Sequence, residues 1–382
     1  MRLFEVLTSG TSHASVARSM LQCALAADFV CGAVELEELE GGWVRPQRFD
    51  QAQRRALQSC LAWHPGLYRQ MARATSGVCL RFATDATEVA LTVRLDEEPR
   101  GTTAVVSKLD SGRRRPHDGI SAMVDGKPFG CELPQALSRP LPWMDDAEGQ
   151  AIFSTPLEDH GNKRAITMSI PGLGKRHEVC LWLPNLRGCE VREIWADGTY
   201  IEAMPTRRRM LVLGDSIGQG FCADDPLLAW PALLAEHLSL ELVNQSVGGQ
   251  VFQPSSLMGA VVDDTELVII ELGGNYRHEP CARSAVQQDI RAFLREVSRA
   301  YEDVRCVVVT PTGHNSSLSP VHAGSCVREV SRMLQRTGRE MGMQVVDGLL
   351  LIDNEDAALA DGEHPSTIGH VQIASRLAAV LQ

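Results

Sequence analysis

The sequence lacks several features that would place it in a membrane or an oxidising compartment. No segment approaches the ~18 consecutive apolar residues of a membrane-spanning helix. Ser19 to Val34 is moderately apolar, but Asp28 interrupts it and neither a basic region nor a small-residue cleavage site frames it, so we expect no secretory signal. The 11 cysteines are scattered and form no C-x-x-C pair. We therefore expect reduced, buried thiols in a cytoplasmic protein rather than a disulfide framework.

An excess of basic residues is also lacking. Lys and Arg number 37 against 48 Asp and Glu, which gives a formal net charge of -11 at pH 7. Nucleic acids and anionic membrane surfaces bind basic faces, so we expect neither as a partner. No His, Asp or Glu cluster has metal-site spacing, so neither a metal nor an organic cofactor is expected. The charge indicates neither the substrate nor the oligomeric state.

The length favours two domains. A chain of 382 residues is long for one hydrophobic core, and 44% hydrophobic with 22% charged residues is typical of a globular protein. The C-terminal half alternates between apolar runs and helical patterns, which predicts a parallel sheet covered on both faces. The expected strands are Met210–Gly214, Leu240–Val247, Leu267–Leu272, Cys306–Thr310 and Met343–Val346, and the expected helices are Pro226–Leu238, Leu257–Val262, Ala282–Tyr301, Ala323–Met341 and Thr367–Leu381.

The N-terminal half is different, because short strand-like runs separated by turns dominate it. These runs are Val78–Thr84, Val89–Leu95, Ile120–Val124 and His177–Leu183, with helices expected only at Ser15–Ala27 and Asp50–Ala62. The pattern predicts an antiparallel β-sandwich of jelly-roll type. Met204-Pro205-Thr206-Arg207-Arg208-Arg209 is the expected boundary, with an accessory domain over residues 1–205 and a catalytic domain over residues 206–382. We expect its three arginines to be a solvated linker.

One strand-like run ends in Gly214-Asp215-Ser216, which is a means of presenting a serine hydroxyl at the end of a strand. A serine needs a base within hydrogen-bond reach to act as a nucleophile, and a histidine base needs an acceptor on its other ring nitrogen. Asp361-Gly362-Glu363-His364-Pro365 supplies both in one loop, since Asp361 and His364 are three residues apart. We expect Asp361 to orient His364 and Asp215 to hold the turn around Ser216.

Acyl transfer also requires donors for the developing oxyanion. Gly249 follows the second strand and offers a backbone amide, Asn275 follows the third strand and offers its side-chain amide, and the Ser216 amide is the third candidate. All of them come just after strands, at the edge where open α/β sheets place their sites.

Several other interpretations fit single residues. Ser216 alone could cap a helix, Asn275 could be a satisfied loop amide, and His364 could be a buried structural histidine. Gly214-Asp215-Ser216-Ile217-Gly218 also fits the G-x-S-x-G elbow of α/β-hydrolases. The elbow is disfavoured because Ser216 follows the first strand of its domain and the acid lies three residues before the histidine.

Taken together, the motifs resemble the SGNH hydrolases, a superfamily also called GDSL esterases and lipases. Gly214-Asp215-Ser216 resembles its first block, Gly249, five residues after Asn244, its second, Gly273-Gly274-Asn275 its third, and Asp361-Gly362-Glu363-His364-Pro365 its fifth. The resemblance implies a three-layer α/β/α catalytic domain, a triad of Ser216, His364 and Asp361, and oxyanion donors at Ser216, Gly249 and Asn275. One departure is Tyr276, which stands where many members have an aspartate after the block-three Asn.

The N-terminal half resembles a subgroup in which a β-sandwich precedes the catalytic domain, as in some carbohydrate acetylesterases. His64-Pro65-Gly66-Leu67-Tyr68-Arg69-Gln70 and the strand after it are similar to that arrangement. We therefore expect a serine esterase that removes a small acyl group, such as acetyl, from a carbohydrate or polyol. The alternatives are an esterase or thioesterase for longer acyl chains or small metabolites, and a carbohydrate-binding protein with an inactive hydrolase domain.

Overall fold

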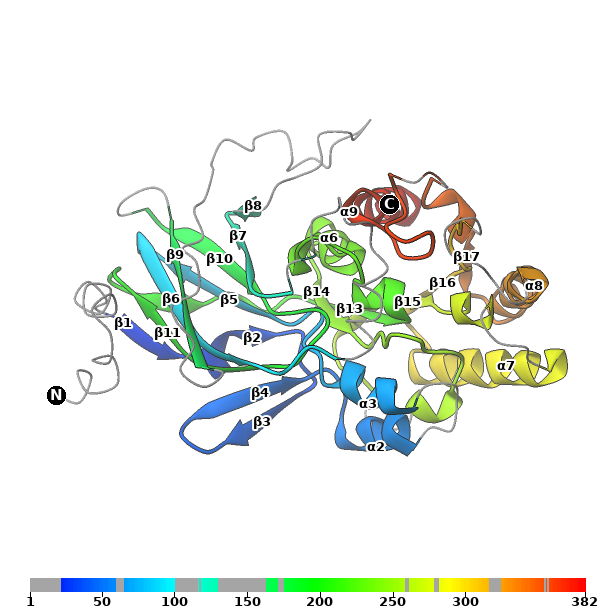
Figure 1. Cartoon of the computed structure of the whole chain (residues 1–382), viewed down its shortest axis with the longest axis horizontal. Helices are drawn as coiled ribbons and strands as arrows, with labels where there is room; N and C mark the ends of the chain where they lie inside the picture. Colours follow the sequence, from blue (N-terminus) through cyan, green and yellow to red (C-terminus); the bar gives the residue numbers. More distant parts are fainter. Residues whose placement is uncertain are drawn as a thin grey trace.

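A computed structural model places an antiparallel β-sandwich beside a parallel sheet flanked by helices (Figure 1). The structure describes residues 22–59, 65–99, 116, 118–129, 163–170, 175–257, 261–277, 282–315, 324–353, 355 and 357–382. The mixed architecture predicted from the sequence, a β-rich half followed by a three-layer α/β/α half, is confirmed.

The sandwich consists of two six-stranded sheets. One has the order β3-β4-β11-β6-β9, with β1 also pairing with β11, and the other has the order β12-β5-β10-β7-β8, with β2 also pairing with β5. All of these pairs are antiparallel. The strands are β1 (Gln22–Leu25), β2 (Val30–Cys31), β3 (Glu35–Leu39), β4 (Trp43–Gln47), β5 (Cys79–Thr84), β6 (Glu88–Leu95), β7 (Ser121–Val124), β8 (Lys127–Phe129), β9 (Lys163–Ser169), β10 (His177–Trp182), β11 (Cys189–Ala196) and β12 (Ile201–Ala203).

The second sandwich sheet is buried on both faces, which explains its apolar runs. On β10, Val179 and Leu181 point into the core between the two sheets, whereas Cys180 and Trp182 join a second core shared with the parallel-sheet domain. Side chains alternate across a strand, so one strand supplies two cores. The outer face of this sheet is therefore the packing surface for the C-terminal domain.

The C-terminal domain is built on a five-stranded parallel sheet of order β14-β13-β15-β16-β17. Its strands are β13 (Arg209–Gly214), β14 (Glu241–Asn244), β15 (Thr265–Glu271), β16 (Arg305–Val309) and β17 (Gln344–Val346). Helices α6 (Trp230–His237) and α9 (Thr367–Leu381) pack in the core on one face, and α7 (Arg283–Ala300) and α8 (Gly324–Glu340) pack in the core on the other. From β13 the chain passes to β14 on one side, and the later strands β15, β16 and β17 follow on the other side. Open α/β sheets bind ligands at such a switch in strand order, which here lies between β13 and β15.

Two helices of the N-terminal half, α2 (Gln51–Ser59) and α3 (Pro65–Ala72), lie outside the sandwich and against the C-terminal domain (Figure 1). Only α2 falls within a predicted helix, Asp50–Ala62, whose last residues lie outside the described part. The sequence patterns missed α3. Short helical turns complete the described elements: η1 (Ala26–Phe29), α5 (Ser216–Gln219), η2 (Pro226–Leu228), η3 (Pro254–Leu257), η4 (Gly274–Arg277) and η5 (Gly348–Leu350).

Two predicted helices are wrong where the structure describes them. Of Ser15–Ala27, residues 15–21 lie outside the described residues, and Gln22–Leu25 form a strand that pairs with β11. Pairing with an open sheet edge here outweighs helix propensity. Within Leu257–Val262, residues 258–260 lie outside the described residues, and the N–H of Val262 donates to the Tyr301 hydroxyl at 3.1 Å instead of a helical carbonyl.

The segment expected as a linker makes ion pairs instead of being fully solvated. Arg207 pairs with Glu236 at 2.9 Å, Arg208 with Glu266 at 3.4 Å, and Arg209, the first residue of β13, with Glu241 at 3.2 Å. The described part of the chain contains no helix long and apolar enough to cross a membrane. Eight of the cysteines lie in that part, and each is a free thiol.

Candidate active site

The turn after β13 presents the serine. Asp215 caps the short helix α5 by accepting the N–H of Ile217 at 3.0 Å through Oδ1. A Cβ atom at Gly214 or Gly218 would come within 2.7 or 2.5 Å of the Ser246 hydroxyl oxygen, so both positions need glycine for close approach. The turn is therefore packed tightly onto the segment that follows β14.

The three residues predicted as a triad come together in the structure. His364 Nε2 lies 2.9 Å from Ser216 Oγ, and His364 Nδ1 lies 2.9 Å from Asp361 Oδ2. The other oxygen of Asp361 accepts the backbone N–H groups of Glu363 at 3.0 Å and His364 at 2.7 Å. Gly362, at φ 87°, allows the loop to close on itself in this way.

The charges of the triad stabilise a protonated imidazole. Burial alone would lower the pKa of His364, but the carboxylates of Asp361, Glu363 and Asp215 outweigh it and raise that pKa above its usual value. Burial likewise opposes ionisation of Asp361, yet the charge and hydrogen bonds of His364 hold the pKa of that carboxyl well below its usual range. Asp361 is thus an anion that favours the imidazolium form of His364.

The two expected oxyanion donors lie at the ends of the neighbouring strands. Gly249 has φ 78°, a conformation that favours glycine, and its carbonyl accepts the Tyr68 hydroxyl at 2.7 Å. The side-chain nitrogen of Asn275 lies 3.1 Å from Asp215 Oδ2 and 3.0 Å from the carbonyl of Gln250. Both amide hydrogens of Asn275 therefore have acceptors, and an incoming oxyanion would have to replace one of them.

A buried carboxyl pair supports the serine turn, and only part of it was foreseen. Asp215 was expected to hold the turn, and it also contacts Asn275. Glu271, a buried carboxyl at the end of β15, accepts the N–H of Gly218 at 3.0 Å. Burial raises the pKa of Asp215 to about 6, and burial followed by the charge of Asp215 raises the pKa of Glu271 well above its usual value. The sequence signal for Glu271 is a charged residue that directly follows the apolar run Leu267–Ile270.

A second buried histidine, which the sequence patterns did not single out, supports the other side of the triad. His370 on α9 accepts the N–H of Trp230 at Nδ1, 3.3 Å away, and donates from Nε2 to the carbonyl of Phe221, 2.9 Å away. This pair of bonds requires the neutral tautomer, and burial lowers the pKa of His370 to about 4. The Phe221 ring in turn stacks on the ring of His364, with centroids 5.5 Å apart.

One group near the triad has the composition of a metal site. The ligand atoms of Cys222, Asp361 and His364 all lie within 4.8 Å of one another. The ring nitrogens of His364, however, already contact Ser216 and Asp361. A metal ion would have to break the triad to bind there, so the donor set fits the triad better than a resident ion.

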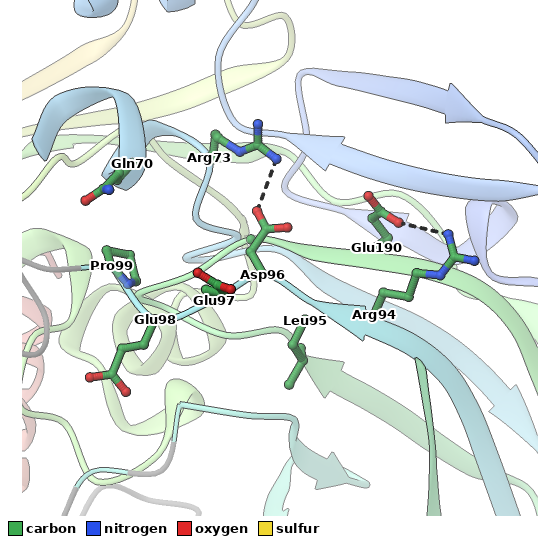
Figure 2. Close-up of a pocket in the computed structure, with 10 residues that line it drawn as sticks. Gln70, Arg73, Arg94, Leu95, Asp96, Glu97, Glu98, Pro99 and Glu190 are labelled. Carbon is green, nitrogen blue, oxygen red and sulfur yellow. Dashed lines mark hydrogen bonds and ion pairs between the residues drawn. The ribbon is translucent and has the colours of Figure 1, made fainter. Parts of the chain in front are cut away.

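A cavity of about 620 Å³ lies away from the triad, between the end of α3 and the rim of the sandwich (Figure 2). Four of its charged side chains form two ion pairs: Arg73 with Asp96 at 3.3 Å, and Arg94 with Glu190 at 3.5 Å. Gln70 also lines it, whereas none of the triad residues does. The cavity is therefore a feature of the sandwich rim, separate from the candidate triad.

The comparisons with known proteins agree with this geometry. Residues 212–371 match the GDSL-like Lipase/Acylhydrolase family. No curated protein sequence matches the chain. The matched segment begins within β13 and ends within α9, so it spans Ser216, Gly249, Asn275, Asp361 and His364.

Solved structures match almost the whole chain. A salicylyl-acyltransferase, SsfX3, from a tetracycline biosynthetic pathway is 18% identical, with a TM-score of 0.71 over 95% of this chain and 98% of its own. A family two carbohydrate esterase from Cellvibrio japonicus is 13% identical, with a TM-score of 0.58 over 94% of this chain and 96% of its own. An acetyl xylan esterase, Est2A, from Butyrivibrio proteoclasticus is 11% identical, with a TM-score of 0.54 over 94% of this chain and 97% of its own. At these identities the likeness is one of fold, and it extends over both halves.

Proposed function

We propose that this chain, a carboxylic ester hydrolase whose residues 212–371 form a domain of the GDSL-like lipase/acylhydrolase family, uses Ser216 as its nucleophile on small acyl esters of carbohydrates or polyols. The observation that carries the proposal is the continuous chain of hydrogen bonds from Ser216 through His364 to Asp361, both at 2.9 Å. We further propose that the catalytic domain begins near residue 206 and that residues 1–205 form the accessory domain.

The geometry supports a two-step mechanism. Ser216 Oγ attacks the acyl carbon while His364 Nε2 takes the hydroxyl proton, and the resulting imidazolium is stabilised by the Asp361 carboxylate. The tetrahedral oxyanion is held by the backbone N–H groups of Ser216 and Gly249 and by the side-chain amide of Asn275. When the intermediate collapses, the C–O bond breaks and His364 gives its proton to the departing alcohol.

Deacylation repeats the same chemical steps with water as the nucleophile. His364 Nε2 takes a proton from water, the hydroxide attacks the acyl-Ser216 carbon, and the acid leaves as the proton returns to Ser216 Oγ. No step requires a metal or an organic cofactor.

The preference for a small acyl group is supported by the site and by the structural neighbours. Ser216 is 8% exposed and His364 6% exposed, so the nucleophile and its base are largely enclosed by protein. Two of the neighbours with the same two-part fold are, by name, a carbohydrate esterase and an acetyl xylan esterase. Another neighbour is an acyltransferase, which makes transfer of the acyl group to a second alcohol the competing activity.

The test compares wild-type protein with Ser216→Ala on p-nitrophenyl esters of increasing chain length and on acetylated sugars. We expect turnover that depends on Ser216, falls steeply beyond short acyl groups, and is lost when an organophosphonate labels Ser216. Adding a sugar acceptor distinguishes hydrolysis from transfer, because transfer produces a new ester in place of free acid.

Three outcomes would contradict parts of the proposal. No Ser216-dependent turnover on any ester, together with no labelling of Ser216, would remove the catalytic assignment. A preference for long acyl chains would overturn the small-acyl assignment alone. New ester formed in preference to free acid would make the chain a transferase that uses the same nucleophile.

A further inference from the structure

The segment that carries Gly249 is held by residues of the N-terminal half. We call residues Asn244–Gln250, which begin at the last residue of β14, the oxyanion loop. Arg48, Gln53 and Tyr68 each hydrogen-bond to this loop across more than 180 positions of sequence. Gln53 Nε2, for example, donates to Gln245 Oε1 at 3.0 Å, and both side chains are buried.

Arg48 links the loop to α3 through backbone carbonyls. Its guanidinium donates to the carbonyls of Asn244 and Ser246 in the loop. It also donates, at 2.6 Å each, to the carbonyls of Met71 in α3 and of Ala74 just after α3. The side chain is 0% exposed. Burial lowers the pKa of Arg48 to about 9, so it remains a cation at neutral pH. A buried cation satisfied by four carbonyls ties the two segments together, since moving either one would leave donors unpaired.

Tyr68 on α3 contacts the residue that matters for catalysis. Its hydroxyl, on a side chain that is 0% exposed, donates to the Gly249 carbonyl at 2.7 Å. On the other side, the N–H of Gly248 donates to Gln219 Oε1 at 2.7 Å. The Gly249 N–H lies between these two points and has no acceptor among the described residues. Its direction is therefore set by Gln219 on one side and by Tyr68 on the other.

We propose that Tyr68 is a positioning residue that aims the Gly249 N–H at the oxyanion, with Arg48 anchoring the loop, so that the N-terminal half is part of the catalytic machinery. The inference rests on the proposed function, because it assigns the Gly249 N–H as an oxyanion donor. Oxyanion donors stabilise the transition state because they already point at the developing charge. A small misplacement of such a donor therefore lowers kcat more than it weakens substrate binding.

The test is the single-atom change Tyr68→Phe, with Tyr301→Phe as its matched control. Tyr301 also has a buried hydroxyl bonded to the backbone, since it accepts the N–H of Val262 at 3.1 Å, but it lies at the end of α7 away from the triad. We expect Tyr68→Phe to lower kcat about tenfold with KM within about twofold. Binding of a boronic acid that mimics the tetrahedral intermediate should weaken in parallel, whereas ground-state binding to Ser216→Ala carrying the same change should not.

The readouts separate this inference from the proposed function. Active wild-type protein with an unchanged kcat for Tyr68→Phe would overturn the inference alone. Equal losses of kcat in Tyr68→Phe and Tyr301→Phe would also overturn it, because a general loss of stability would explain them. Wild-type protein without Ser216-dependent turnover would overturn the proposed function, and this inference with it.

Discussion

Asn275 can donate to an oxyanion only by giving up one of its present hydrogen-bond acceptors. Its amide donates to Asp215 and to the Gln250 carbonyl in the resting structure, so the oxyanion gains a preoriented donor only by replacing one of these acceptors. We expect Asn275→Ala to lower kcat by roughly 10²-fold, as the loss of one oxyanion donor does. Steady-state kinetics of both proteins on a p-nitrophenyl ester would measure this fall in kcat. A near-normal kcat in a folded variant would exclude Asn275 from the oxyanion site.

His364 makes the reaction depend on pH in a predictable direction. Burial disfavours its charged form, but the carboxylates of Asp361 and Glu363 outweigh burial and raise the pKa of His364 above its usual value. The base must be neutral to accept the Ser216 proton, so kcat/KM should rise as pH increases through that raised pKa. Glu363→Gln removes one of the raising charges and should move the midpoint to lower pH.

The control for this pH profile is Glu302→Gln, which removes an exposed carboxylate far along the chain from the loop. Its midpoint should equal that of the wild type. A midpoint that stays in place or moves to higher pH in Glu363→Gln would contradict the assignment of His364 as the group that titrates.

At the scale of elements, the last helix couples stability to pH through His370. The pKa of His370 is lowered to about 4 by burial, from 6.5, so between these values the unfolded chain binds a proton that the folded chain excludes. This contribution to stability is complete above pH 6.5 and is lost as pH falls toward 4. Over that window the free energy of unfolding of the wild type should fall by about 3 kcal/mol relative to His370→Gln.

Urea denaturation of both proteins at several pH values would measure that difference. Asp215 and Glu271, with raised pKa values, act in the opposite direction over part of the same range, and the comparison with the variant removes their contribution. A difference that does not change between pH 7 and pH 4 would show that His370 becomes protonated in the folded protein.

The elements that the sequence predicted well are those whose apolar residues recur at regular spacing because one face packs into a core. Helix α9 runs from Thr367 to Leu381 as predicted, with the Ser366 side chain accepting the N–H of Gly369 at its start. Strand β11 was missed because its core residues Cys189, Val191, Ile194 and Ala196 are spaced by two, three and two. The register shifts between Val191 and Ile194, and this bulge interrupts the alternation that predicts a strand.

The residues of the candidate site also divide into those with a local sequence pattern and those without one. Residues next to Gly-rich turns at strand ends, such as Ser216 and Asn275, carry a local pattern and could be named from the sequence. Arg48, Tyr68 and His370 act through contacts with segments far along the chain, and their neighbours in sequence carry no pattern that indicates these contacts. Only Glu271 gave a partial signal, as a carboxyl on an apolar strand that needed a partner.

At the scale of the whole molecule, the two halves share one hydrophobic core. Trp182 on β10, which is 2% exposed, lies in the same cluster as Met210 and Trp230 of the C-terminal domain. A core that crosses between domains makes them unfold together, because neither can keep its apolar surface buried without the other. We therefore expect one cooperative transition, and Trp182→Ala should lower the free energy of unfolding by about 3–5 kcal/mol and separate the two halves.

Alkylation of two buried thiols can follow the unfolding of each half separately. Cys189 lies in the core between the sandwich sheets and Cys306 in the core beneath α7 and α8. Pulse alkylation across a urea series, read by peptide mass spectrometry, should label both at the same midpoint in the wild type. In Trp182→Ala the midpoints should differ, whereas Trp43→Ala, which removes a buried tryptophan from the other sheet, should lower both midpoints together. Different midpoints in the wild type would mean that the shared core does not couple the halves, and the contacts of Arg48 and Tyr68 would then have to hold the oxyanion loop without it.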